Sequence, residues 1–404
     1  GRSVLVAAPT GAGKTIVALL AAVVAMENGL QVAFMAPTEI LAEQQFATVS
    51  RLLQGARFRV ALLTGSTKSA AKRAQRADIE RGDVSLVVGT HALVQGDIAF
   101  HRLGLVIIDE QHRFGVLQRA SLREKGLHPD VLVMTATPIP RTLALTVYGD
   151  LDTSVIRDLP PGRLPIRTIA KPESRRDDIY QLVRGEIDAG RQAYIVYPLV
   201  EASAKVEVRA ATEMHDHLAQ EVFPHYRTGL LHGRMKADAK DEVMKAFAAG
   251  EIQILVATTV IEVGIDVANA TVMLIEHAER FGLSQLHQLR GRVGRGAHQS
   301  TCCLLYQSPL SDDARERLKA MTETTDGFQI AERDLALRGP GDFFGTRQAG
   351  MPTFRLIDLA RDQDLLDVAR REAADWLTAM RPTAAAIEDL VSAWAARFRL
   401  IEVG

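Results

Sequence analysis

The sequence predicts an α/β protein in which two parallel-sheet domains follow each other and a helical segment comes last. Short apolar runs rich in β-branched residues alternate with helical stretches, the pattern of buried parallel strands joined by crossover helices. The alternation breaks at Asp158–Pro165, where three prolines and one glycine fall within eight residues, and then resumes. A chain of 404 residues is also long for a single core.

The first domain is expected at residues 1–157. Its strands are predicted at the apolar runs Ser3–Ala7, Val32–Ala36, Val60–Leu63, Val84–Val88, Gly104–Ile108 and Val131–Met134. Helices are predicted between several of these runs, at Ile16–Met26, Glu39–Leu53 and Ala70–Arg81. The segment Asp158–Pro165 is interpreted as a linker.

The second domain is expected at residues 158–310. Its predicted strands are Ala193–Tyr197, Thr228–Leu231, Ile252–Val256, Val272–Ile275 and Thr301–Tyr306. No strand pattern follows Ser311. Residues 311–404 predict a charged helical stretch, a glycine-rich segment at Arg338–Gly350 and a helical tail with Trp376 and Trp394 as packing residues.

Composition limits the kinds of partner. With 47% hydrophobic and 24% charged residues the chain is typical of a soluble globular protein, and its net charge of −1 offers no general attraction to nucleic acid. A polyanion would have to be held by local basic patches. The adjacent cysteines, Cys302 and Cys303, lack zinc spacing and are expected to be buried thiols in a reducing compartment, so we expect a cytoplasmic chain. The run Ile16–Met26 is too short to span a bilayer.

The first chemical signal is the stretch Ala8-Pro-Thr-Gly-Ala-Gly-Lys-Thr15, which lies between a predicted strand and a predicted helix. Backbone N–H groups at Gly11, Ala12 and Gly13 can surround phosphate oxygens at the start of a helix. Lys14 can reach the β- and γ-phosphates, and the Thr15 hydroxyl can ligate Mg²⁺. Ala8 replaces the first glycine of the pattern. An ordinary tight turn would not need the lysine, so the stretch predicts an ATP site.

Two further stretches complete a site for phosphoryl transfer. Asp109 and Glu110 end an apolar strand, where Asp109 suits Mg²⁺ and Glu110 suits the activation of water; a lone pair of this kind could equally be a solvated turn. Arg292 and Arg295 lie three residues apart and would share one face if the segment is helical. They can stabilise charge on a γ-phosphate from the second domain, although a basic surface turn is the alternative.

Together these stretches resemble the motifs of superfamily 2 helicases, and among them the RecG family of branch-migration DNA helicases. The resemblance runs from residue 3 to about residue 360. It rests on Ala8–Thr15, Met35–Gln44, Val88–His91, Asp109–Val116, Thr135–Thr142, Val256–Asp266, Gln288–Arg295 and Phe328–Gln348, in the family's order. It implies two RecA-like domains, followed at about 311–350 by a translocation motif made of a helical hairpin and a loop.

The resemblance also assigns roles. Gly264 and Asp266 are expected at the nucleotide, and Thr38, His91 and Thr258 at the DNA backbone, which they would contact without reading sequence. Coupling of hydrolysis to movement is expected at Thr135, Thr137, Gln288, Arg338 and Gln348. The implied cofactors are ATP and Mg²⁺, and the implied partner is branched or forked duplex DNA. Single-strand DNA-binding protein is a further candidate partner, and a monomer in the bacterial cytoplasm is expected.

Three other readings stay open at this point. Transcription-repair coupling factors share most of the motifs but usually carry Asp-Glu-Glu-His where this chain has Gln111; Leu151–Ile156, Leu159–Arg163 and Gly345–Gly350 favour the RecG side. A DEAD-box RNA helicase would carry Asp-Glu-Ala-Asp. A non-catalytic nucleotide-binding scaffold would be expected to lose Glu110 or the arginines. Family members also have an N-terminal wedge domain and an adenine-framing segment, which we expect to lie outside a sequence that begins at Gly1.

Overall fold

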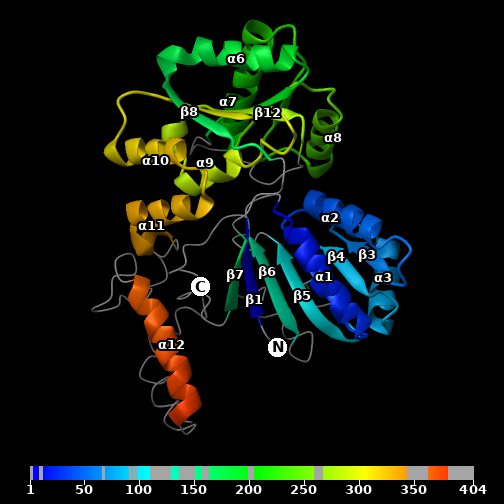
Figure 1. Ribbon diagram of the computed structural model, residues 1–404. Coiled ribbons are helices and arrows are strands. Elements are labelled where there is room, and N and C mark those ends of the chain that lie inside the picture. Colours follow the sequence, from blue (N-terminus) through cyan, green and yellow to red (C-terminus); the bar gives the residue numbers. More distant parts are fainter. Residues whose placement is uncertain are drawn as a thin grey trace.

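The computed structural model describes residues 3–8, 12–65, 69–90, 93, 98–109, 129–135, 151–156, 163–198, 204–258, 267–343 and 363–380. Within these ranges the chain forms two parallel sheets and a helical segment (Figure 1). The predicted fold class, two tandem RecA-like domains followed by helices, is confirmed.

The first sheet has seven parallel strands in the order β3-β4-β2-β5-β6-β1-β7. Their bounds are β1 Ser3–Ala7, β2 Gln31–Met35, β3 Val60–Leu63, β4 Leu86–Gly89, β5 Leu103–Asp109, β6 Asp130–Thr135 and β7 Leu151–Val155. The helices among them are α1 Lys14–Glu27, α2 Glu39–Leu52 and α3 Ser69–Arg81. Alternate strand residues face two separate cores, one shared with α1 and α2 and the other with α3.

The second sheet has six parallel strands in the order β10-β11-β9-β12-β13-β8. Their bounds are β8 Arg167–Pro172, β9 Gln192–Val196, β10 Thr228–Leu231, β11 Ile254–Ala257, β12 Ala270–Ile275 and β13 Thr301–Tyr306. The helical elements are η3 Glu173–Arg175, α6 Arg176–Asp188, α7 Ala204–His217, the π-helical turn η4 Leu218–Val222, α8 Ala237–Ala248, η6 Ala278–Arg280 and α9 Leu283–Arg290. Apart from β7, the strand order repeats that of the first sheet.

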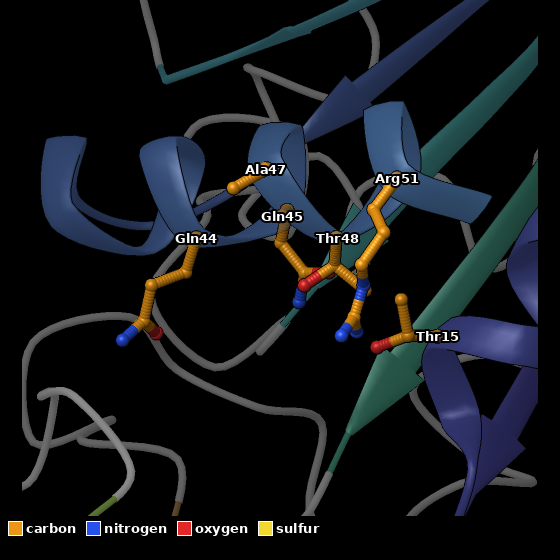
Figure 2. Close-up of a pocket in the computed structure, with 6 residues that line it drawn as sticks. All are labelled: Thr15, Gln44, Gln45, Ala47, Thr48 and Arg51. Carbon is orange, nitrogen blue, oxygen red and sulfur yellow. The ribbon is translucent and has the colours of Figure 1, made fainter. Parts of the chain in front are cut away.

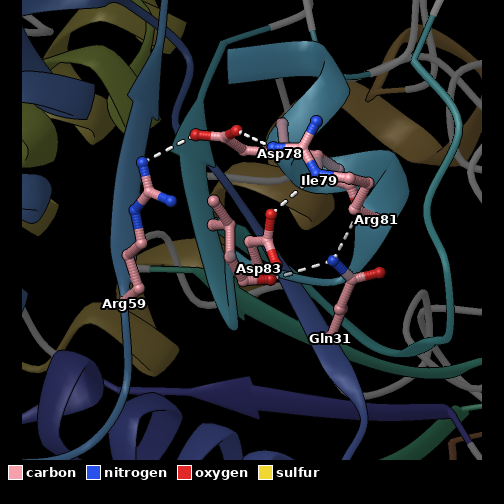
Figure 3. Close-up of polar contacts among 7 residues, drawn as sticks. Gln31, Arg59, Asp78, Ile79, Arg81 and Asp83 are labelled. Carbon is pink, nitrogen blue, oxygen red and sulfur yellow. Dashed lines mark hydrogen bonds and ion pairs between the residues drawn. The ribbon is translucent and has the colours of Figure 1, made fainter. Parts of the chain in front are cut away.

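A buried glutamine occupies the same place in both sheets. Gln31, the first residue of β2, donates from Nε2 to the carbonyl oxygens of Ile79 and Val84, at 2.9 and 2.8 Å (Figure 3). Gln192, the first residue of β9, donates in the same way to Phe247 at 2.6 Å and to Ile252. Each amide therefore joins the end of a helix to the chain just before the next strand, where main-chain carbonyls would otherwise be buried unpaired.

After the second sheet the chain continues through α10 Asp312–Glu323, α11 Gly327–Phe343 and α12 Gln363–Met380. Ile330 and Leu335 of α11 are buried. Helix α11 runs on through Gly339-Pro340-Gly341, so the predicted glycine-rich segment begins as helix. On α12, Trp376 is 44% exposed and does not pack as expected, while Trp394 lies outside the described residues.

Candidate functional site

The predicted phosphate-binding residues lie between the end of β1 and the start of α1. Gly13 caps the helix in the left-handed region, at a φ of 88°, which glycine adopts without a steric penalty. Lys14 begins α1, and its Nζ donates to the carbonyl oxygen of Ala8 at 3.0 Å, so its side chain folds back over the loop. Ala12 and Thr15 are half-buried beside it. The helix N-terminus and the lysine provide the donors that a triphosphate needs.

Asp109 is the last residue of β5 and is only 8% exposed. Its Oδ2 accepts a hydrogen bond from Nε2 of Gln45, on α2, at 3.2 Å. A pocket of about 570 Å³ lies alongside and is lined by Thr15 and, from α2, by Gln44, Gln45, Ala47, Thr48 and Arg51. Figure 2 shows Thr48 and Arg51 pointing from α2 toward Thr15. The hydroxyl of Thr15 and the carboxylate of Asp109 are hard oxygen ligands of the kind that Mg²⁺ prefers.

On the second domain, Arg292 and Arg295 follow α9 in a loop. The condition for a shared helix face is not met, because α9 ends at Arg290. Both arginines are half-buried, and Nε of Arg295 donates to the carbonyl oxygen of Gly291 at 3.2 Å. Burial raises the pKa of Tyr194, on β9, to about 12, against the lowering effect of the positive charges of Arg292 and Arg295. The two guanidinium groups therefore lie near one buried hydroxyl at the centre of the second sheet.

Arg290 was not singled out from the sequence, although it lies within the same motif. It is 2% exposed, and its Nη1 donates to the carbonyl oxygens of Met321 and Thr324 at 3.0 and 2.9 Å. Its Nη2 donates to the carbonyl oxygen of Thr325 at 3.3 Å and approaches Nδ1 of His287 at 3.1 Å. Arg290 thus fastens α9 to the turn between α10 and α11.

A second contact joins the same elements. Ser284 Oγ, on α9, donates to Oδ2 of the buried Asp334, on α11, at 2.6 Å. From α10, Nη2 of Arg317 donates to the carbonyl oxygen of Glu279 at 2.8 Å. The helical segment after the second sheet is therefore bonded to the element that precedes the loop of Arg292 and Arg295. Gln288 is half-buried on α9.

The other predicted site residues fall into two groups. Thr38 caps α2, with its hydroxyl accepting from the N–H of Leu41 at 3.3 Å. Thr135 and Thr258 are buried at the ends of β6 and β11, and Thr258 Oγ1 has no hydrogen-bond partner among the described residues. For Arg338 only the backbone is described, within α11. Gly11, His91, Glu110, Thr137, Gly264, Asp266 and Gln348 lie outside the described residues.

Glu39 and Asp241 show how the domains face each other. Burial raises the pKa of the Asp241 carboxyl, on α8, and the nearby carboxylates of Asp238 and Glu39 raise it further, against the lowering effect of Lys245. Glu39 is the first residue of α2, so α8 of the second domain lies near the beginning of α2 in the first (Figure 1). The carboxyl ends of the first sheet are therefore turned toward the second domain.

Three family models match the chain along its length. Residues 1–146 match the DEAD/DEAH box helicase model, and residues 174–297 match the helicase conserved C-terminal domain. Residues 324–394 match the C-terminal part of domain 3 of the ATP-dependent DNA helicase RecG. The third match favours RecG over the transcription-repair coupling factors.

Comparison with individual proteins agrees. The ATP-dependent DNA helicase RecG of Synechocystis is 53% identical over 386 residues, which cover 96% of this chain and 46% of that protein. A structure of RecG bound to a three-way DNA junction aligns with a TM-score of 0.72 at 46% identity, covering 90% of this chain and 47% of that one. The chain belongs to the RecG family.

Membership of the RecG family narrows the open readings. The yeast RNA-bound protein Dbp5 also aligns, with a TM-score of 0.59 over 92% of this chain and 89% of that one, but at 15% identity it shares only the fold. The chain spans about half the length of the RecG proteins it matches. Among the described residues, no helix has the length and apolar character needed to cross a membrane.

Proposed function

We propose that this chain is the motor of a DNA helicase that hydrolyses ATP, moves along duplex DNA and remodels forks and branched junctions. The observation that carries the proposal is the 53% identity to a RecG helicase across nearly the whole chain. The geometry supports it, because a phosphate cradle and a buried carboxylate lie on one sheet while a loop with two arginines follows the other. The proposed divisions are residues 1–157, 158–310 and 311–404.

In the proposed reaction, Lys14 leaves the Ala8 carbonyl and binds the β- and γ-phosphates. Thr15 and Asp109 would hold Mg²⁺, whose chemistry when bound would be to neutralise charge on the phosphate oxygens. Glu110 orients the attacking water and accepts its proton. Arg292 and Arg295 stabilise the charge that develops on the γ-phosphate when the domains close, with Gly264 and Asp266 beside the nucleotide.

Movement on DNA is assigned to residues at the same edges of the two sheets. Thr38, His91 and Thr258 would contact the phosphate backbone, which suits a motor that must pass over any sequence. Thr135, Thr137 and Gln288 would link the nucleotide to these contacts. Arg338 and Gln348 would pass domain closure to the DNA. A junction-bound RecG structure supports branched DNA as the partner. Single-strand DNA-binding protein, a monomeric state and the bacterial cytoplasm complete the proposal.

Steady-state ATP hydrolysis by the 404-residue chain tests the function. Turnover would be compared without nucleic acid, with linear duplex DNA, with a three-way junction and with single-stranded RNA. Duplex and junction DNA are expected to stimulate turnover, and the stimulation should weaken as salt rises, because phosphate contacts release counterions. Stronger stimulation by RNA than by either DNA would contradict the proposal.

A further inference from the structure

The last residues of the connection between the two sheets, 163–166, are hydrogen-bonded to the loop that carries Arg292 and Arg295 and to the residues just after it. The connection leaves β7 of the first sheet and enters β8 of the second. Before β8 begins, Nε of Arg163 donates to the carbonyl oxygen of Gly294 at 2.9 Å, between the two arginines in sequence.

Two more hydrogen bonds continue this pairing toward the sheet. Nε2 of Gln299 donates to the carbonyl oxygen of Pro165 at 2.7 Å, and the N–H of Arg167 donates to the carbonyl oxygen of Ser300 at 2.9 Å. From there β8 and β13 pair in parallel, with Arg167 opposite Thr301. The end of the connection therefore extends the β8–β13 pairing back to the arginine loop.

Packing at Gly294 leaves no room for a side chain. Gly294 adopts a φ of 74°, and a Cβ there would lie 2.7 Å from Cγ1 of Ile166, the residue just before β8. On the next turn of the loop, a Cβ at Gly296 would lie 2.4 Å from the carbonyl oxygen of Ala268. The loop is therefore confined by close contacts on two sides, and Ile166 of the connection makes the contact on one side.

Other attachments of the loop among the described residues come from the second domain itself. Val293 is fully buried in the core of that domain, and Arg290, just before the loop, is bonded to the α10–α11 turn. Arg163 is different because it belongs to the segment that joins the domains. Burial lowers the pKa of the Arg163 guanidinium, and a partly desolvated cation makes a stronger bond to a carbonyl than an exposed one.

We propose that Arg163 is a positioning residue, which holds the Gly294 carbonyl and thereby sets the placement of Arg292 and Arg295 for ATP hydrolysis. When one domain rotates against the other, the connection between them must change its path. Arg163 moves with the connection and thereby shifts the loop. This inference rests on the proposed function, because it requires that the two arginines act on ATP.

The test is the Arg163→Met variant of the 404-residue chain, with kcat and KM for ATP measured without DNA. Its kcat is expected to fall on the order of 10-fold with KM almost unchanged, because displaced catalytic groups lose rate rather than ground-state binding. Arg163→Lys keeps a donor for Gly294 and should give an intermediate kcat. Arg167→Met is the matched control, since the Arg167 side chain is exposed and its bond to Ser300 is made by the main chain.

A double variant separates positioning from general stability. If Arg163 acts through the loop, adding Arg163→Met to Arg292→Lys should cost much less than it does in the wild-type background, because the two effects share one route. A wild-type kcat in Arg163→Met would overturn the inference, and so would a full multiplicative loss in the double variant. Neither result depends on DNA, so a failure of DNA stimulation would count against the proposed function alone.

Discussion

At the scale of single residues, two positively charged side chains of the candidate site donate hydrogen bonds to main-chain oxygens. Lys14 donates to the Ala8 carbonyl, and Arg295 to that of Gly291. These bonds satisfy half-buried charges. In the proposed reaction, Lys14 and Arg295 would exchange them for bonds to phosphate oxygens.

Replacing Lys14 by alanine should abolish ATP turnover, because no other described residue of the cradle supplies a positive charge. The fold should persist, since the hydrogen bond that is lost to the Ala8 carbonyl is only partly buried. Turnover and circular dichroism would be compared with Lys240→Ala, whose Nζ also donates to a nearby carbonyl, that of Gly233 at 2.8 Å, but from an exposed site on α8. Turnover retained in Lys14→Ala would exclude Lys14 from the reaction.

His287 carries a prediction on pH. Its burial, and secondarily the charge of Arg290, lower its pKa to about 3, so its neutral Nδ1 can accept from Arg290. The unfolded chain binds this proton near pH 6.5 and the folded chain does not, so stability is full above pH 6.5 and is lost as the pH falls toward 3. Between pH 7.5 and 5.5 this residue should account for about 1 kcal/mol of the fall in unfolding free energy.

Denaturant unfolding of His287→Gln at those two pH values checks this, because glutamine can still accept from Arg290 but does not titrate. The variant should lose less stability on acidification than the wild type does. Equal slopes in the variant and the wild type would show that His287 protonates as readily in the folded chain as in the unfolded chain.

At the scale of elements, the two sheets depend on the same device. Gln31 also accepts from the N–H of Arg102 at 3.0 Å, and Gln192 accepts from Nδ2 of Asn269 at 3.2 Å. Both glutamines are at most 4% exposed. Each side-chain amide thus both donates and accepts hydrogen bonds at the place where the end of a helix, the start of a strand and a neighbouring loop meet. A substitution of either glutamine should therefore lower the stability of its domain by a similar amount.

Substituting leucine for Gln31 or for Gln192 should lower the unfolding free energy by roughly 2–4 kcal/mol, because two main-chain carbonyls lose their donor in a buried place. Denaturant titration of each variant would measure it. Gln54→Leu, at an exposed position after α2, is the control and should stay within about 0.5 kcal/mol of wild type. A loss no larger than that at Gln31 would mean that water replaces the amide.

The elements also show where sequence patterns sufficed. All eleven predicted strands are present. Central strands such as β2 and β9 are buried on both faces and therefore apolar along their length, and the edge strands β3 and β10 are short apolar runs as well. The strands β7 and β8, also at sheet edges, were missed because polar residues such as Asp152 and Lys171 give them the pattern of a loop. Helix α11 continues through Pro340, a residue that a local pattern treats as a helix breaker.

At the scale of the whole molecule, the candidate site could be predicted only in part. Lys14, Asp109 and the two loop arginines follow from short motifs, since their chemistry restricts residue type and spacing. Arg163 and Arg290 do not follow, because their partners lie 131 and 31 to 35 residues away in sequence. Long-range contacts of this kind leave no periodic signal. The domain boundaries and the roles of the DNA-facing residues stay predictions.

The bonds of Arg290 predict how the parts of the molecule communicate. If the α10–α11 segment senses DNA, its signal reaches the arginine loop through Arg290, whose planar guanidinium serves three carbonyls of the turn at once. Arg290→Lys keeps the charge but cannot reproduce that fork. The basal rate of ATP hydrolysis should therefore remain within a few-fold of wild type, while stimulation by duplex DNA is largely lost, on the order of 10-fold.

The measurement is the ratio of turnover with duplex DNA to turnover without it, at matched protein stability. Arg315→Lys serves as control, because Arg315 is an exposed residue of α10 that, within the described part of the chain, forms an ion pair with the neighbouring Asp312 at 2.8 Å. Full stimulation in Arg290→Lys would show that DNA acts on the arginine loop by another route, such as the connection held by Arg163. If basal and DNA-stimulated turnover instead fall in equal proportion, Arg290 stabilises the hydrolytic site itself. The ratio of the two rates therefore distinguishes an effect on ATP hydrolysis from an effect on its coupling to DNA.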